Sequence, residues 1–105
     1  MAHANRPETV RVSIDPDLQA LIPGFLQNRR QDIQTLQKAV VVEDFETIRT
    51  LGHRMRGDGG GYGFHMISEI GQALEEAALK KNRPEIMARV QELTTYLGRI
   101  EVVYE

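Results

Sequence analysis

Residues 84–100 read PEIMARVQELTTYLGRI and give the clearest helical signal in the chain. Their apolar residues recur at alternating spacings of four and three, which is the period of one helix face. Pro84 suits a helix start, because a first-turn residue needs no N–H partner. The apolar face consists of Ile86, Val90, Leu93, Leu97 and Ile100. We predict an amphipathic helix here, which residues 102–105 are expected to prolong.

The same period predicts three more helices upstream. Asp15-Pro16 is a helix-start signal and predicts a short lead-in helix that bends at Pro23, and Asp44 is a second N-cap candidate. The expected apolar faces are Phe25, Leu26, Ile33, Leu36 and Val40 up to about residue 42; Phe45, Ile48, Leu51 and Met55; and Ile67, Ile70, Leu74, Ala77 and Ala78. The predicted fold is all-α, an antiparallel up-down-up-down four-helix bundle with a short N-terminal lead-in helix.

The length of 105 residues predicts one domain. We expect a flexible N-terminal arm over residues 1–12 and the bundle over residues 13–105. Residues 10–14 alternate like a strand, but no partner strand is predicted, so an extended lead-in is expected there.

Charge and composition restrict the function. Thirteen basic and fifteen acidic residues give a net charge of 13 − 15 = −2, which does not favour nucleic acid, and Arg29-Arg30 is expected to be a solvated pair. No apolar run approaches the ~20 residues that cross a bilayer, and the first residues do not resemble a signal peptide. These features predict a cytoplasmic protein. Without cysteine, a metal site is not predicted.

The histidine at position 53 is the candidate functional residue. With about 100° per residue, the apolar face of the second helix centres roughly 200° from His53, so the imidazole should point away from the core. Arg49 and Arg56 fall within about 60° of it, one turn before and one turn after. A neutral imidazole is nucleophilic near pH 7, and arginine can bind the oxygens of an arriving phosphoryl group. Gly57 follows at i+4 and leaves the approach clear.

Other interpretations remain open at this stage. An exposed helical histidine is usually an ordinary surface residue, and the glycines of residues 57–63 can mark close helix packing or a tight turn. His65 could border a docking surface or simply be solvated. The glycine cluster is not followed by Gly-Lys-Ser/Thr, so it does not predict a phosphate-binding loop.

The segment His53-Arg54-Met55-Arg56-Gly57, with Gly63 ten residues after the histidine, resembles the histidine-containing phosphotransfer (HPt) domains of two-component phosphorelays. Residues 64–78 look like the helix that follows in this family, and the likeness covers roughly residues 14–101. The resemblance implies a four-helix bundle that accepts phosphate on His53 from a receiver-domain aspartate and passes it to another receiver. Magnesium would belong to the receiver, and the chain itself would be no enzyme and need no cofactor.

The resemblance also implies residue roles. Arg56 takes the place of the family's lysine beside the phosphoryl group; Arg49, placed by the helical period and not by the resemblance, is a second candidate cation. Glu75 matches a polar residue that hydrogen-bonds the imidazole from the next helix. Asp58 departs from the small residue usual there. The residues expected to meet the receiver are Gly57, Gly60, Arg54, Tyr62 and Phe64.

The implied partners are the receiver domains of response regulators and of hybrid histidine kinases, bound transiently by a monomer. Asp58 would repel phosphate unless Arg54 neutralised it, which favours an alternative: a degenerate adaptor that binds receiver or kinase domains without carrying phosphate. A second alternative, a structural bundle without a signalling role, predicts a His53 that is buried or locked by hydrogen bonds.

Overall fold

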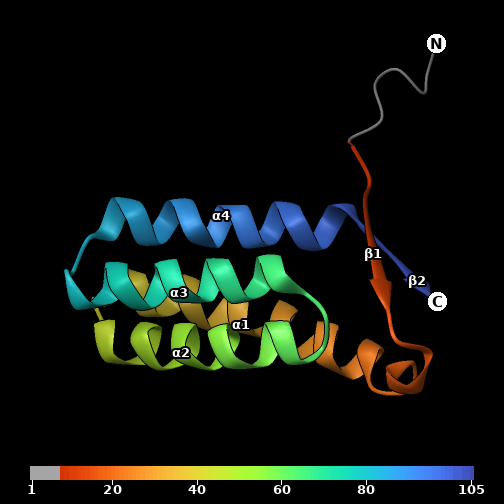
Figure 1. Cartoon of the computed structure of the whole chain (residues 1–105). Coiled ribbons are helices and arrows are strands. Elements are labelled where there is room, and N and C mark those ends of the chain that lie inside the picture. The colour runs from red at the N-terminus through yellow and green to blue at the C-terminus, as the bar shows by residue number, and fades with distance from the viewer. Residues whose placement is uncertain (1–7) are drawn as a thin grey trace, which may run out of the picture.

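The computed structural model describes residues 8–105, which form four helices and two short strands (Figure 1). In chain order the elements are β1 (Val10–Ile14), the 3-10 turn η2 (Pro16–Leu18), α1 (Ile22–Val41), α2 (Phe45–Gly61), α3 (His65–Leu79), α4 (Arg83–Arg99) and β2 (Ile100–Tyr104). The four predicted helices are confirmed. Links at residues 42–44, 62–64 and 80–82 turn the chain back, so that α2 begins and α3 ends at the same end of the bundle (Figure 1).

Local sequence signals explain where the helices begin. The Asp44 carboxylate accepts a hydrogen bond from the Thr47 N–H at the start of α2, and the Asn82 side chain accepts one from the Glu85 N–H at the start of α4. Such caps satisfy N–H groups that have no partner within the helix. Prolines occupy the first turns of α1 and α4, where no N–H is needed.

The core lies between the four helices and contains most of the predicted apolar faces, although Ile33, Phe45 and Ile100 are only partly buried. Fully buried examples are Leu36 on α1, Ile48 and Met55 on α2, Leu74 on α3 and Leu93 on α4. Burying one such side chain stabilises the fold by about 1.5–3 kcal/mol. This core fixes which side of each helix faces solvent.

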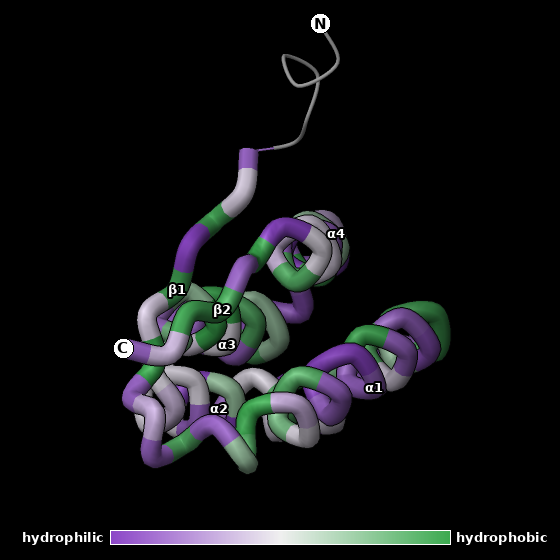
Figure 2. Tube along the Cα trace, turned by 90° about the vertical axis from the view of Figure 1, so that its right-hand side faces the viewer, coloured by the Kyte–Doolittle hydropathy of each residue, from purple (hydrophilic) through white to green (hydrophobic). Residues whose placement is uncertain are grey.

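The two ends of the chain pair with each other, which the sequence did not predict. β1 and β2 form a parallel two-stranded sheet in which Val10 pairs with Ile100 and Ile14 with Tyr104 (Figure 2). The expectations of an unpaired lead-in at 10–14 and of a helical tail at 102–105 were therefore wrong. The backbone becomes extended at Ile100, and Val12 and Val102 pack against the core. Burying these side chains stabilises the chain more than extending α4 through residues 102–105 would.

The N-terminal part differs in two further ways. The expected lead-in helix is reduced to the single turn η2, after which α1 begins at Ile22, one residue before Pro23. The predicted end of the arm at residue 12 is wrong, because residues 10–12 belong to β1 and pair with β2. The rest of that arm, residues 1–7, lies outside the described residues.

Candidate functional site

His53 lies on the side of α2 that faces solvent. Its side chain is 60% exposed, whereas Leu51 and Met55 on either side of it along the chain are buried. The ring therefore stands away from the core, as the helical period predicts. The buried histidine that a purely structural bundle predicts is not observed, and the hydrogen bond to Glu75 engages only one of the two ring nitrogens.

One ring nitrogen of His53 is held and the other is free. Nδ1 lies 3.1 Å from the Glu75 Oε2 and 3.3 Å from the Arg56 Nη2. The Arg56 Nε also lies 3.5 Å from the Glu75 Oε1, so the three side chains form one cluster. The Glu75 carboxylate can only accept a hydrogen bond and the Arg56 guanidinium can only donate one, so Nδ1 cannot bond to both. We assign the ring proton to Nδ1, because the contact with Glu75 is the shorter; Nδ1 then donates to Glu75, and Arg56 is a neighbouring cation without a hydrogen bond to the ring. Nε2 then keeps its lone pair, and among the described residues it has no hydrogen-bond partner.

Glu75 reaches His53 because α2 and α3 approach very closely. A Cβ at Gly52 would lie 2.7 Å from both the Glu75 N and the Gly71 O, and one at Gly71 would lie 2.6 Å from the Arg56 N. Real Cβ atoms essentially never make such contacts. The two glycines therefore set the helix separation at which a side chain of α3 can meet the imidazole on α2.

Ser68 of α3 stabilises the glycine-rich end of α2. Its hydroxyl donates to the Arg56 carbonyl, 2.8 Å away, and accepts from the Gly60 N–H, 2.7 Å away. An uninterrupted helix would pair these two backbone groups with each other. Gly59 lets Ser68 come this close, because a Cβ there would lie 2.6 Å from the Ser68 N. These contacts help α2 continue to Gly61 despite its glycines.

The other predicted cations lie beside the cluster rather than in it. The Arg49 guanidinium forms an ion pair with Glu46, and this hydrogen bond raises the pKa of Arg49. Arg54 is exposed, and its charge acts on the α1 carboxylate of Asp32. Burial nevertheless raises the pKa of Asp32 overall, although Arg29 also opposes that shift.

The sequence suggested a solvated Arg29, but the residue is buried, with 8% of it exposed. Its Nε lies 2.8 Å from the Asp32 Oδ2, its Nη1 4.0 Å from the Asp58 Oδ2, and its guanidinium 4.8 Å from the centre of the Phe25 ring. The paired carboxylates and the aromatic ring compensate for its burial. Asp58 is therefore turned towards α1 and Arg29 instead of towards Arg54.

The expected docking residues differ in accessibility. Gly57 is fully open, since a Cβ there would meet nothing within 4 Å, but Gly60 lies against Ser68 and His65. Phe64 is 0% exposed and cannot form a rim; its burial completes the core at the α2–α3 link. Tyr62 is half-buried, with its ring centre 4.5 Å from that of Phe25. Both aromatic side chains turn inwards because they pack on Phe25.

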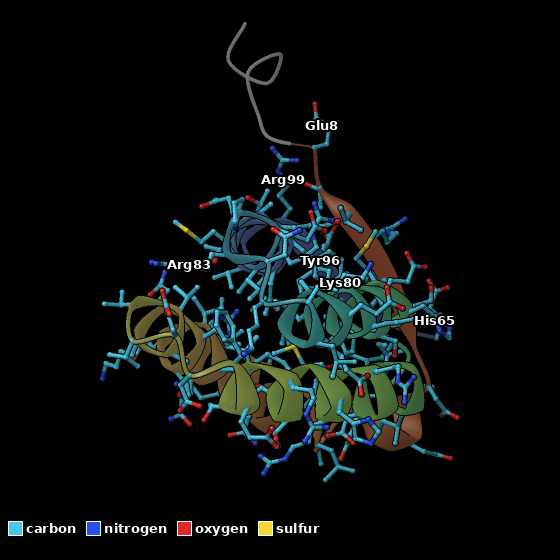
Figure 3. The ribbon with its side chains drawn as sticks, turned by 90° about the vertical axis from the view of Figure 1, so that its left-hand side faces the viewer. Glu8, His65, Lys80, Arg83, Tyr96 and Arg99 are labelled. Atoms are coloured by element: carbon cyan, nitrogen blue, oxygen red, sulfur yellow. The ribbon has the colours of Figure 1, made fainter. Side chains whose placement is uncertain are left out.

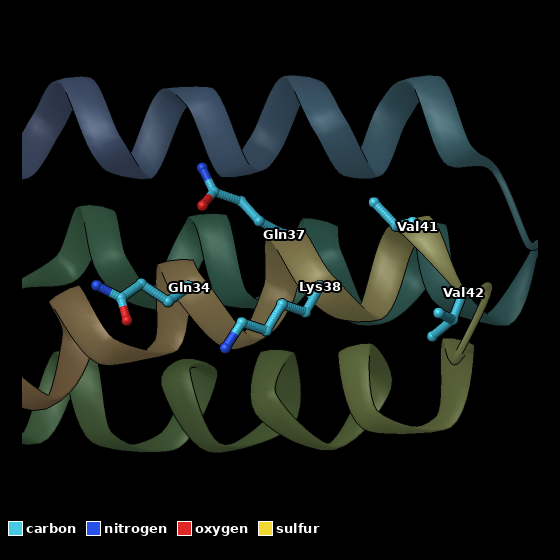
Figure 4. Close-up of a pocket in the computed structure, with 5 residues that line it drawn as sticks. All are labelled: Gln34, Gln37, Lys38, Val41 and Val42. Atoms are coloured by element: carbon cyan, nitrogen blue, oxygen red, sulfur yellow. The ribbon is translucent and has the colours of Figure 1, made fainter.

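Two other features lie outside the His53 cluster. His65 is exposed at the start of α3 and points outward in Figure 3. An open depression on α1 is lined by Gln34, Gln37, Lys38, Val41 and Val42 (Figure 4). Its single charged side chain belongs to lysine, so it brings together no acid–base pair.

Within residues 8–105, no helix combines the length and apolar character needed to cross a membrane.

Sequence reasoning missed Gly52, Gly71 and Ser68 as determinants of the site. A signal existed for the glycines, since both interrupt otherwise helical patterns, where glycine costs about 1 kcal/mol relative to alanine. No comparable signal pointed to Ser68, because its role depends on the partner helix.

Comparison with known proteins agrees with this geometry. A family model described as Hpt domain matches residues 20–102, which is most of the chain. No curated protein and no solved structure matches it. Since the matched region contains all four helices and the His53 cluster, the chain belongs to the Hpt domain family, whose members transfer phosphoryl groups through a histidine in phosphorelays.

Proposed function

We propose that this chain accepts a phosphoryl group on the Nε2 of His53 from the aspartyl phosphate of one receiver domain and passes it to the aspartate of another. The observation that carries this proposal is the asymmetry of the imidazole. Nδ1 is engaged by Glu75, while Nε2 is free on a ring that is 60% exposed. The proposed partners are the receiver domains of response regulators and of hybrid histidine kinases. We propose that the chain acts as a monomer.

The transfer step follows from this arrangement. The Nε2 lone pair attacks phosphorus, an N–P bond forms, and the P–O bond to the receiver aspartate breaks and leaves a carboxylate. The Nδ1 proton stays in place, so the ring becomes positively charged. Glu75 stabilises that charge through the hydrogen bond it already accepts. The reverse steps return the phosphoryl group to a second aspartate.

Arg56 and Gly57 support the same function. Arg56 lies at the imidazole and can donate to phosphoryl oxygens, as the family's lysine would, through a planar head that binds two oxygens at once. Gly57 offers no side chain to obstruct an incoming receiver. The chain would supply the nucleophile and its surroundings, magnesium would come from the receiver, and the chain would not act as an autonomous enzyme.

The position of Asp58 supports phosphate transfer over the alternative of a phosphate-free adaptor. That alternative rested on Asp58 repelling a phosphoryl group, but the carboxylate lies 4.0 Å from the Nη1 of Arg29 on the side facing α1. On the helical wheel Asp58 lies about 140° from His53. No described contact places a competing negative charge at Nε2.

The test is transfer from a receiver that carries labelled aspartyl phosphate, in the presence of magnesium. The wild-type chain should acquire acid-labile label, and His53→Gln should acquire none. His65→Gln is the matched control, because it removes the other described histidine, which is also exposed; it should be labelled like the wild type. Label that persists in His53→Gln would exclude the proposed function.

A further inference from the structure

A depression without an assigned role lies at the end of the bundle where the α1–α2 and α3–α4 links meet. Its volume is about 440 Å³, and its lining residues are Glu43, Asp44, Phe45, Glu46, Arg49, Ala78, Leu79 and Lys81. We call it the link depression. It is separate from the depression on α1, with which it shares no lining residue.

The link depression exposes apolar surface that the core does not use. Leu79, the last residue of α3, is 66% exposed, and Phe45, the first residue of α2, is half-buried beside it. Exposed apolar surface that borders a polar rim is typical of sites that bind another molecule. These two side chains form the apolar floor.

This depression lies on the same face as the His53 cluster. Arg49 precedes His53 by four residues on α2, and Leu79 follows Glu75 by four residues on α3. Each step is one helical turn of about 6 Å, and both steps lead to the end of the bundle where α2 begins and α3 ends (Figure 1). The imidazole and the link depression therefore share one continuous surface.

Two residues at this depression keep charged side chains where glycine is the usual choice. Glu43 has φ of 58° and Lys81 has φ of 54°, both in the left-handed region just after a helix. Glu43 accepts a hydrogen bond of 3.2 Å from the Arg83 Nη1, which connects the α1–α2 link to the start of α4; Arg83 lies beside the end of α1 in Figure 3. The carboxylates of Glu43 and Glu46 are paired with arginines, and that of Asp44 caps the start of α2. Lys81 forms no ion pair within residues 8–105. Its charge is available to a partner.

We infer that the link depression is a second docking point for the receiver domain, which places an apolar side chain on Phe45 and Leu79 and an acidic side chain at Lys81. This inference rests on the proposed function, because a receiver must cover His53 during transfer. A specific interface buries about 800 Å² on each partner, so it extends well beyond one helical turn. Continuity with the His53 face and the unpaired charge of Lys81 favour the receiver as the occupant.

The test compares phosphotransfer by Leu79→Gln and Lys81→Gln as the concentration of phosphorylated receiver is varied. Each substitution should raise KM for the receiver, by about tenfold for Leu79→Gln, and leave kcat unchanged. Matched controls are Met87→Gln, which alters an exposed apolar side chain of α4, and Lys80→Gln, which alters the neighbouring lysine outside the depression. Equal KM values for Leu79→Gln and Met87→Gln would overturn the inference.

Two further measurements separate docking from other causes. Lys81→Gly removes the side chain and relieves the positive φ, so it should weaken docking as Lys81→Gln does while its thermal stability stays the same or rises. Calorimetric binding of the unphosphorylated receiver to His53→Gln should weaken when Leu79→Gln is added. This result supports the docking point even if no phosphate reaches His53, and unchanged affinity would overturn it.

Discussion

Gly71→Ala is expected to lower the free energy of unfolding by roughly 3 kcal/mol, in the upper range for overpacking. The new Cβ would lie 2.6 Å from the Gly52 O and 2.6 Å from the Arg56 N. These are backbone atoms of a helix and cannot rotate away, so α2 and α3 must separate. Gly52→Ala is expected to have a similar effect, because its Cβ would meet the Gly71 O at 2.7 Å.

Urea denaturation followed by circular dichroism measures both losses. Gly57→Ala is the matched control, since it places the same methyl group on α2, the helix of Gly52, where nothing lies within 4 Å. That variant should be more stable than the wild type by up to about 1 kcal/mol, because alanine favours a helix over glycine. A Gly71→Ala protein as stable as Gly57→Ala would contradict the close helix packing described here.

Glu75→Ala is expected to slow phosphotransfer to His53 by about 100-fold at a saturating receiver concentration. Without the carboxylate, Nδ1 has no described acceptor, and the tautomer with a free Nε2 is no longer favoured. The positive charge of the phosphorylated ring also loses its closest counter-charge. Glu75→Gln should be slowed less, about tenfold, because an amide oxygen can still accept from Nδ1 but carries no charge.

Rapid-quench measurement of labelled phosphate on the chain gives these rates. Glu76→Ala serves as the control, because it removes an exposed carboxylate from the neighbouring position of α3. It should transfer at nearly the wild-type rate. Wild-type rates in Glu75→Ala would mean that the carboxylate does not position the imidazole.

The sequence predicts the features that depend on local periodicity. The four helices, the cap at Asp44 and the outward direction of His53 all follow from residue spacing on single helices. The position of Glu75 beside His53 could be anticipated only through the family resemblance, because spacing within one helix carries no information about contacts between two helices.

Features that depend on distant parts of the chain could not be predicted. β1 and β2 are separated by almost the whole chain, and each is too short to signal its partner. Arg29 looked solvated although Phe25 and Asp32 lie one turn away on α1, because its burial and its contact with Asp58 arise only once α1 packs on α2. Phe64 looked accessible beside the glycines, yet it fills the core at the turn of the α2–α3 link.

The most direct test of the account identifies the ring atom that carries the phosphoryl group. The chain is phosphorylated by its receiver after labelling with ¹⁵N-histidine, and its imidazole signals are recorded by NMR. We predict phosphorus bonded to the Nε2 of His53, with Nδ1 still protonated. Phosphorus on Nδ1, or an unmodified His53 in a fully phosphorylated chain, would contradict the assignment of Nε2 as the nucleophile.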